Sequence, residues 1–178
     1  IFLRRYTQAE LVGFEVSDSQ LKLAKQRSAG LGNTQLTQTL STVGGDFDLV
    51  FCHHVVEHIA DAQLPDFIQQ LAKPLGPGGK LVIATPNGVN PVAYAYYMST
   101  DRTHLRMHSS ATLAEVLRPS GLTIVSVHRE LPQAYDLSTL AKTLVWAISA
   151  FFLKFIVLSN AAGVRANRFG VSMAATFY

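Results

Sequence analysis

The sequence alternates short apolar runs with helical stretches, and this alternation constrains the fold more than any other feature. The runs Phe47–Cys52 (FDLVFC) and Lys80–Pro86 (KLVIATP) are rich in the residues that favour buried strands. Between them, over Ala60–Leu75, apolar residues repeat at spacings of three and four, which is the period of a helix with one apolar face. Strands separated by such helices predict an α/β fold with a doubly wound, mostly parallel sheet covered on both faces.

Other segments extend the same pattern on both sides. Ala9–Ser17 predicts a buried strand, and the capping box that begins at Ser17 predicts a helix to about Ala29. Gly76–Gly79 (GPGG) predicts a turn. The remaining predicted elements are a weaker strand in 33–41, a helix over 109–121, and strands in 122–130 and 169–178.

Composition limits the class of protein. The chain has 178 residues, of which 48% are hydrophobic and 15% charged, so it is a folded chain of single-domain size. Its single cysteine, Cys52, excludes an intramolecular disulfide and fits a reducing, cytoplasmic compartment. No run of Lys and Arg with interleaved aromatics occurs, which argues against a nucleic-acid partner. No secretory signal is visible, and because the chain starts at Ile1 we expect a piece upstream.

The segment 140–158 (LAKTLVWAISAFFLKFIVL) predicts an apolar helix, inserted at about 137–160 before the last strand. Its polar residues fall within an arc of roughly 140° at 100° per residue, so the helix is one-sided. After Asp136 the chain has four basic and no acidic residues. The helix is expected to pack on the sheet or on a neighbouring subunit, to lie on a membrane surface, or to span a membrane, and the sequence leaves these alternatives open.

The string His54-Val-Val-Glu57-His58 spells H-x-x-E-H, the motif of inverted zinc peptidases. A zinc site of this type needs a helix that carries both histidines on one face. Here His53 directly follows a predicted strand, and the helical period begins only near Leu64. We therefore predict no metal, and we expect Glu57 and His58 to hold the loop and the helix start through hydrogen bonds.

Three segments in this order resemble class I S-adenosylmethionine-dependent methyltransferases of the group that methylates small molecules, lipids and glycans. They are LVGFEVSDSQLKLAKQR, GGDFDLVFCHHVVEHIAD and LAKPLGPGGKLVIATPN, and HLRMHSSATLAEVLRPSGLTIVSV resembles the continuation of that group. The resemblance covers about residues 9–127 and implies a Rossmann-like sheet of seven strands with the last one antiparallel. It also implies S-adenosylmethionine as cofactor, bound at the carboxyl ends of the central strands.

The resemblance assigns cofactor-binding residues. Glu15, at the end of a predicted strand, is similar to the acid that accepts hydrogen bonds from both ribose hydroxyls, and Val16 would pack on the adenine. Ser41 and Thr42 stand where the family usually has an acidic residue that contacts the adenine amino group. The cofactor's methionine end is expected near three consecutive residues after the predicted strand: Cys52, His53 and His54.

Two histidines are candidates for the catalytic base. His104, in the loop DRTHLRMHSS, and His53 are placed where an imidazole can take a proton from a hydroxyl acceptor. The alternative is that His104 only fixes its loop, and this structural role is preferred for His108. Three tyrosines either line an acceptor pocket or simply pack the loop: Tyr94, Tyr96 and Tyr97.

The family's glycine-rich loop and the strand and helix around it would precede Ile1, so the resemblance predicts a single methyltransferase-like domain over 1–178 that lacks its N-terminal motif. The expected reaction is methyl transfer to an O, C or N nucleophile of a small or lipid-linked acceptor. The first alternative is a catalytically incomplete binding or membrane-associated module. The second is a dinucleotide-binding oxidoreductase, which also places an acid after its second strand.

Overall fold

The computed structural model describes residues 9–128, 137–160 and 172–177. The chain divides into two compact units, Ile1–Asp46 and Phe47–Tyr178. The predicted strand in 169–178 is observed over its described residues, whereas the last residues of the strand predicted in 122–130 lie outside the described part. The expectation of a single domain over the whole chain stays a prediction.

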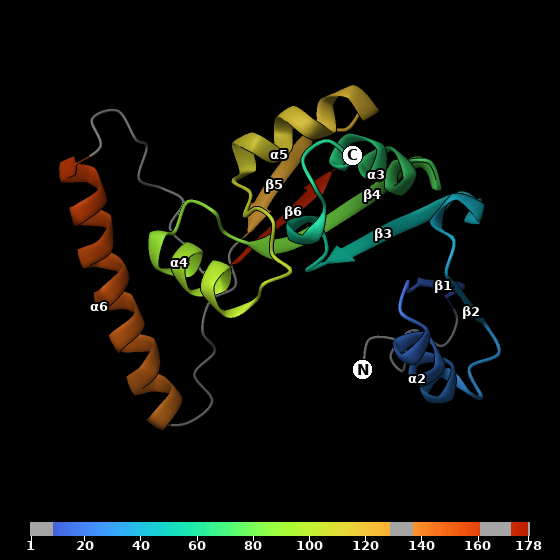
Figure 1. The fold of residues 1–178 in the computed structure, drawn as a ribbon, viewed down its shortest axis with the longest axis horizontal. Coiled ribbons are helices and arrows are strands. Elements are labelled where there is room, and N and C mark those ends of the chain that lie inside the picture. The colour runs from blue at the N-terminus through green and yellow to red at the C-terminus, as the bar shows by residue number, and fades with distance from the viewer. Residues whose placement is uncertain (1–8, 129–136, 161–171, 178) are drawn as a thin grey trace. The chain divides into compact units, whose positions relative to one another are not determined.

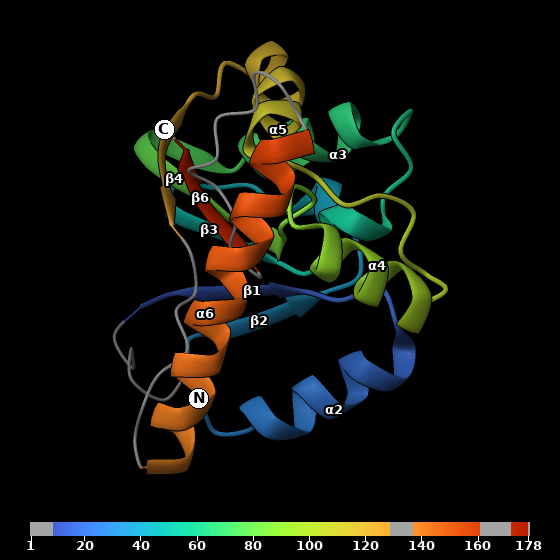
Figure 2. The ribbon, with the colours of Figure 1, turned by 90° about the vertical axis from the view of Figure 1, so that its left-hand side faces the viewer.

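The first unit is a strand–helix–strand unit (Figure 1). Strands β1 (Leu11–Phe14) and β2 (Thr34–Thr37) pair in parallel, and α2 (Asp18–Ser28) connects them. The helix begins as predicted, because the side chain of Ser17 caps it by accepting from the backbone N–H of Gln20. Figure 2 shows α2 lying along one face of the two strands.

The second unit is built on a four-stranded sheet in the order β3-β4-β6-β5. Strands β3 (Phe47–His53) and β4 (Leu75–Pro86) are parallel. Strand β6 (Ser172–Phe177) lies between β4 and β5 (Ile124–His128) and is antiparallel to both. The expected parallel pairing and the antiparallel last strand are therefore confirmed.

Two helices pack together on one face of this sheet, as both ribbon views show (Figures 1 and 2). They are α3 (Leu64–Ala72) and α5 (Ser110–Leu117), which the Ser109 side chain caps. Gly121 follows α5 in the left-handed region at φ 74°, so the predicted glycine stop is observed. The core consists of apolar side chains from the two helices and from β4, all less than 7% exposed: Leu64, Ile68, Leu71, Leu81, Ile83, Leu113 and Leu117.

Two local differences from the predicted elements have physical causes. Helix α3 begins at Leu64 because Ala60–Gln63 forms a turn, in which Gln63 N donates to Ala60 O at 2.8 Å. The predicted turn Gly76–Gly79 lies inside β4, where the pairing with β3 changes register between Phe47 and Leu49. A bulge therefore absorbs the glycines without ending the strand.

Helix α4 (Pro91–Thr100) was not predicted. The side chain of Asn90 caps it by accepting from the backbone N–H groups of Val92 and Ala93, and Pro91 occupies its first turn. Asn-Pro was the available signal. It was masked by the lack of amphipathic spacing, since only Ala93 of this helix is buried.

The predicted apolar helix is observed as α6 (Leu137–Asn160). Seven of its large apolar side chains are 49–68% exposed, so in this structure they do not pack on the sheet: Leu140, Leu144, Val145, Ile148, Phe151, Phe152 and Phe155. Over the residues described, no helix has the length and apolar character needed to cross a membrane.

Gly79 tests the close pairing of β3 with β4. A Cβ at this position would lie 2.6 Å from Phe47 O and 2.9 Å from Gly76 O, so Gly79→Ala must push two backbone segments apart. We expect a loss of about 1–3 kcal/mol in the free energy of unfolding, measured by urea denaturation. Gly44→Ala is the control, because a Cβ at Gly44 would meet nothing within 4 Å. Equal stability of the two variants would contradict the described pairing.

Candidate functional site

Polar side chains gather where β3 and β4 end. His54 follows β3 with a backbone φ of 52°, in the left-handed region that non-glycine residues rarely adopt. Its N–H still donates to Ala84 O of the neighbouring strand at 2.8 Å. A short 3₁₀ turn, η2 (Val56–His58), comes next and brings Glu57 back against the strand ends.

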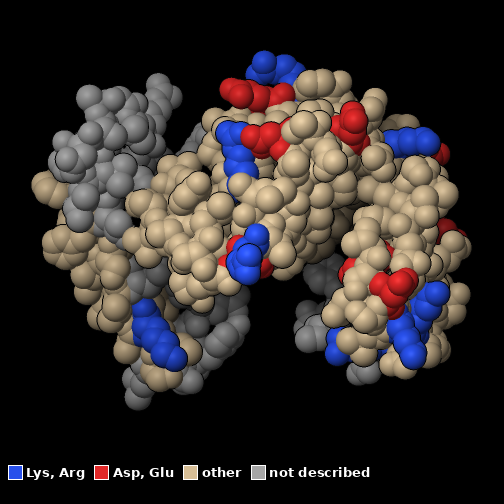
Figure 3. All heavy atoms as spheres, in the orientation of Figure 1, with Lys and Arg blue, Asp and Glu red and all other residues tan. Residues whose placement is uncertain are grey.

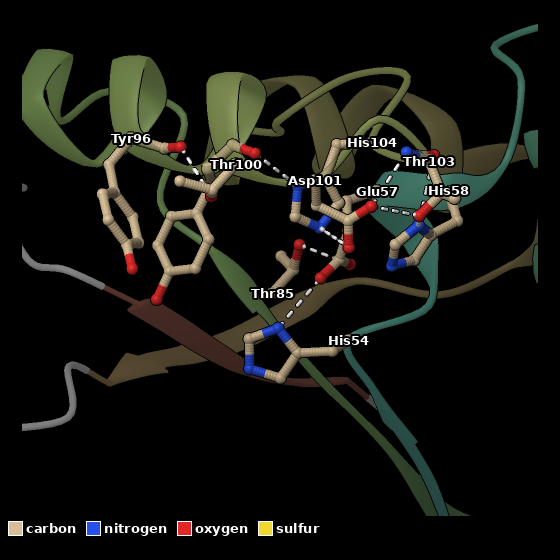
Figure 4. A network of polar contacts seen from close by, with 10 residues as sticks. His54, Glu57, His58, Thr85, Tyr96, Thr100, Asp101, Thr103 and His104 are labelled. Atoms are coloured by element: carbon tan, nitrogen blue, oxygen red, sulfur yellow. Dashed lines mark hydrogen bonds and ion pairs between the residues drawn. The ribbon is translucent and has the colours of Figure 1, made fainter.

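Glu57 is the centre of this group, and its residue is fully buried. Its Oε1 lies 2.9 Å from His54 Nδ1, and its Oε2 accepts from the Thr85 hydroxyl at 3.0 Å (Figure 4). Its backbone carbonyl accepts from the N–H groups of Leu105 and Arg106 at 2.8 and 3.3 Å. Glu57 thus connects the loop after β3, the end of β4 and the loop before α5.

A second network lies beside the first (Figure 4). His58 Nδ1 is 2.9 Å from the Thr103 hydroxyl and 3.2 Å from the Thr103 carbonyl oxygen. The Thr103 hydroxyl and N–H both donate to Asp101 Oδ1. These two hydrogen bonds, and chiefly the one from the hydroxyl, lower the pKa of Asp101 below its ordinary 3.8. The expectation that Glu57 and His58 hold the loop through hydrogen bonds is therefore confirmed.

His104 belongs to the second network. Its Nδ1 lies 2.8 Å from Tyr97 O and its Nε2 lies 3.8 Å from Asp101 Oδ2, while its side chain is 7% exposed. Its ring centroid is 4.6 Å from that of His58. Tyr94 and Tyr96 are exposed on α4. The proposed catalytic role of His104 stays a prediction.

The histidines of the H-x-x-E-H string do not share a helix face. His54 contacts Glu57, whereas His58 turns to Thr103, and the string forms a strand end and a 3₁₀ turn. Within the described residues, one different group offers ligand atoms within 4.8 Å of one another: Glu57, His58 and His104. Hydrogen bonds already occupy both Glu57 oxygens, so we describe this group as part of the network that orders the loop, and the absence of a metal stays a prediction.

The other residues expected at the cofactor's methionine end differ in exposure. Cys52 is 4% exposed, and burial, with a smaller effect of the Glu57 carboxylate, raises the pKa of its thiol to about 12. The thiol is therefore protonated at neutral pH and is no nucleophile. His53 is exposed, with its ring centroid 5.7 Å from that of Phe51 and 4.3 Å from that of His54.

The residues expected at the cofactor's adenosine end lie in the first unit. Glu15 directly follows β1, where its N–H donates to Thr37 O at 3.0 Å and its Oε1 accepts from Ser17 N at 2.9 Å. Val16 is 70% exposed. Ser41 and Thr42 are exposed in the 3₁₀ turn η1 (Leu40–Thr42). The cofactor-binding roles of these residues stay predictions.

Sequence reasoning missed Thr85, Asp101 and Thr103. Asp101-x-Thr103 carries a local signal, since an Asp side chain often accepts from the backbone N–H two residues on. Thr85 carries none, because a threonine near the end of a buried strand is ordinary, and its partner Glu57 is 28 residues away.

Comparison with known proteins places the chain in a family. Residues 1–127 match the methyltransferase domain family, which is more than half of the chain. The chain is 32% identical over 84 residues to the ubiquinone biosynthesis O-methyltransferase of Chelativorans sp. and 34% identical over 79 residues to that of Caulobacter sp.. These matches cover 44% and 41% of this chain but only 32% and 31% of the relatives, so the chain spans about a third of the length of the curated relatives it matches.

Solved structures share the fold. A SAM-dependent methyltransferase from Archaeoglobus fulgidus has a TM-score of 0.67 at 17% identity, over 99% of this chain and 80% of that one. An S-adenosylmethionine-dependent methyltransferase from Mesorhizobium loti has a TM-score of 0.64 at 14% identity, over 99% and 84%. The Rossmann-like fold prediction is confirmed, and the chain belongs to the methyltransferase domain family.

His108, which precedes the start of α5, makes stability depend on pH. The residue is 1% exposed, and neither ring nitrogen has a hydrogen-bond partner among the described residues. Burial, and after it the charge of Arg106, lowers the pKa of His108 below 6.5, and these effects outweigh the carboxylates of Asp61 and Glu57, which raise it. Just below pH 6.5 the unfolded chain therefore binds more protons than the folded one. The stability that comes from burying a neutral His108 is fully present above pH 6.5 and is lost as the pH falls below that value.

Replacing His108 with phenylalanine keeps an aromatic ring of similar size and removes the titrating group. We expect the free energy of unfolding of His108→Phe, measured by urea denaturation, to fall less between pH 7.5 and pH 5.5 than that of the wild type. His128→Gln, at an exposed strand position, should follow the wild type. If His108→Phe kept the full acid sensitivity, another group would be responsible.

Proposed function

We propose that this protein transfers the sulfonium methyl group of S-adenosylmethionine to a hydroxyl of a small or lipid-linked acceptor. The membership of residues 1–127 in the methyltransferase domain family carries this proposal. The oxygen acceptor is preferred over carbon or nitrogen because both curated relatives described above are O-methyltransferases. The protein works in the cytoplasm, where its single buried cysteine needs no disulfide partner.

The residues at the end of β1 fit the cofactor's ribose. A carboxylate offers two acceptor oxygens to two adjacent hydroxyl donors, and Glu15 stands directly after a parallel strand, as ligand-binding residues do in open α/β sheets. Glu15 Oε1 accepts from Ser17 N, which fixes the carboxylate. Exposed Val16 leaves an apolar surface for the adenine.

The chemical demand on the protein is modest, because the cofactor is already activated. The acceptor oxygen has to be aligned behind the methyl carbon, and holding the two reactants in this geometry supplies most of the acceleration. A hydroxyl acceptor also has to lose its proton to a base, and the sequence predicts His104 or His53 for this role.

Glu15→Ala tests the assignment of the cofactor site. Loss of both acceptor oxygens should weaken the binding of S-adenosylhomocysteine by at least about tenfold, since hydrogen bonds to a charged group contribute about 1.5–3 kcal/mol each. Isothermal titration calorimetry measures this in Ile1–Tyr178 and in a version extended upstream in its gene. Exposed Glu10→Ala is the matched control.

Unchanged affinity of Glu15→Ala would contradict the site assignment. Heat from NAD in place of S-adenosylhomocysteine would favour the oxidoreductase alternative. Binding of S-adenosylhomocysteine without methyl transfer by the extended protein would favour the binding-module alternative.

The apolar side of α6 is proposed to contact an anionic membrane surface. At 100° per residue, the seven exposed apolar side chains of this helix fall within an arc of roughly 140°, and exposed Lys142 lies outside that arc. The sequence of α6 carries two basic residues, Lys142 and Lys154, and no acidic one, and the face of the helix drawn in Figure 3 shows no acidic group. An apolar stripe flanked by lysine suits a helix that lies on acidic lipids, which also hold a lipid-linked acceptor.

Vesicle co-sedimentation tests this contact. The protein should sediment with phosphatidylglycerol vesicles and much less with phosphatidylcholine vesicles, and Phe151→Ser together with Lys142→Glu should abolish the binding. Lys73→Glu, which makes the same charge change at the end of α3, should not. Self-association that the same α6 substitutions remove, without vesicle binding, would show that a second copy covers the helix.

A further inference from the structure

We propose that His54 is the catalytic base of the methyl transfer, and that Glu57 and Thr85 are the residues that position it. This inference rests on the proposed function and deepens it, because it names the atom that takes the acceptor's proton. The sequence pointed to His104 and His53 for this role, and to His54 only as a neighbour of the cofactor.

The hydrogen bond between His54 and Glu57 sets the state of the imidazole. An ionised carboxylate can only accept, so His54 Nδ1 carries the proton in its 2.9 Å contact with Glu57 Oε1. The neutral ring then has its lone pair on Nε2, on the side away from Glu57. Figure 4 shows this second nitrogen turned away from Glu57 and Thr85. The side chain is 36% exposed, so a substrate hydroxyl can reach it.

The surroundings of Glu57 fix the position of its carboxylate. It is fully buried, its second oxygen accepts from the Thr85 hydroxyl at 3.0 Å, and Thr85 itself is fully buried in β4. A buried carboxylate in this position orients an imidazole and stabilises its positive charge once a proton has been taken up. The contacts of the Glu57 carbonyl with Leu105 and Arg106 fix the backbone as well.

The backbone at His54 points to the same role. A φ of 52° is unfavourable for a residue with a Cβ, and among the described residues only His54 and glycines have positive φ. Such outliers persist where surrounding contacts over-determine them, and they gather at active sites. Here the conformation turns the imidazole from the end of β3 onto Glu57.

The two other histidines are less suited as bases. His104 is only 7% exposed, and its Nδ1 and Nε2 face Tyr97 O and Asp101 Oδ2. His53 is exposed, but its described contacts are with the rings of Phe51 and His54, so no carboxylate orients it.

The acceptor O–H proton moves to His54 Nε2 while an oxygen electron pair forms the bond to the methyl carbon. The carbon–sulfur bond breaks, and its electron pair stays on sulfur, which leaves S-adenosylhomocysteine as the neutral-sulfur product. The imidazolium then gives its proton to water.

The tautomer of His54 is measurable without knowing the acceptor. Two-bond ¹H–¹⁵N correlation spectra at pH 8 distinguish an imidazole protonated on Nδ1 from one protonated on Nε2, and His54→Gly identifies the signal. We expect Nδ1 protonation for His54 in the wild type. Exposed His128 supplies the comparison signal, identified with His128→Gln. A His54 protonated on Nε2 overturns the proposal, whether or not methyl transfer is observed.

A pair of acceptors separates a base from a structural residue. Phenol has to lose a proton during the reaction, whereas thiophenol of the same shape is already a thiolate at pH 8. His54→Gly suits the φ of 52° and should fold well. With S-adenosylmethionine, it should lower kcat for phenol by about 100-fold or more and leave that for thiophenol nearly unchanged. Added imidazole should restore part of the phenol rate.

Positioning is tested in the same assay with Thr85→Val, which keeps the side-chain shape and removes the hydroxyl, and with Glu57→Gln. Both should reduce kcat for phenol more than for thiophenol, with little change in KM. Equal losses for the two acceptors in His54→Gly, without rescue, would overturn the base role. Selective loss and rescue in His53→Gly or His104→Gly would assign the base to that residue. Absence of transfer by the wild type to either acceptor would count against the proposed function and leave the tautomer result to decide on the His54–Glu57 pair.

Discussion

The buried carboxylate of Glu57 is the constraint on which the end of the sheet depends. An ionised group without water needs donors on both oxygens, and here His54 and Thr85 supply them from two neighbouring strand ends. Its carbonyl is met by the N–H groups of Leu105 and Arg106. One residue thus fixes three segments that are distant in sequence. Removing any donor leaves part of a buried charge unsatisfied.

The same constraint accounts for the chemistry proposed for this edge. A carboxylate that the Thr85 hydroxyl holds in place can orient the imidazole of His54. If the carboxylate were exposed to solvent, water would compete with the imidazole for the same hydrogen bond. In the neighbouring cluster of His58, Thr103 and Asp101, the hydrogen bonds connect η2 with the loop that follows α4 and order that loop. The two networks meet at Glu57-His58, and in the first the Nε2 of His54 is directed away from Glu57 and Thr85 (Figure 4).

Much of the fold followed from local patterns, whereas the site depended on distant pairs. The strands around Phe47 and Lys80 and the helix capped by Ser109 could be predicted, because apolar spacing and capping act within a few residues. Helix α4 could not be predicted, because only Ala93 of this helix is buried and its apolar residues therefore show no amphipathic period. The roles of Glu57 and His58 in the loop were foreseen from the flanking strand. The partnership of Glu57 with Thr85 required the register of β3 on β4, which no local pattern encodes.

The position of the last strand has a consequence for how the protein is made. Because β6 lies between β4 and β5, the sheet of the second unit remains split into two parts until residues 172–177 have left the ribosome. Strand β4 has to keep one edge open while about ninety further residues are translated, and α6 emerges in this interval with its apolar side exposed. Closing the sheet then joins segments about ninety residues apart, and pairings of this separation form slowly. The nascent chain therefore passes through a stage with an unpaired strand edge and an apolar helix, the kind of surface that chaperones bind.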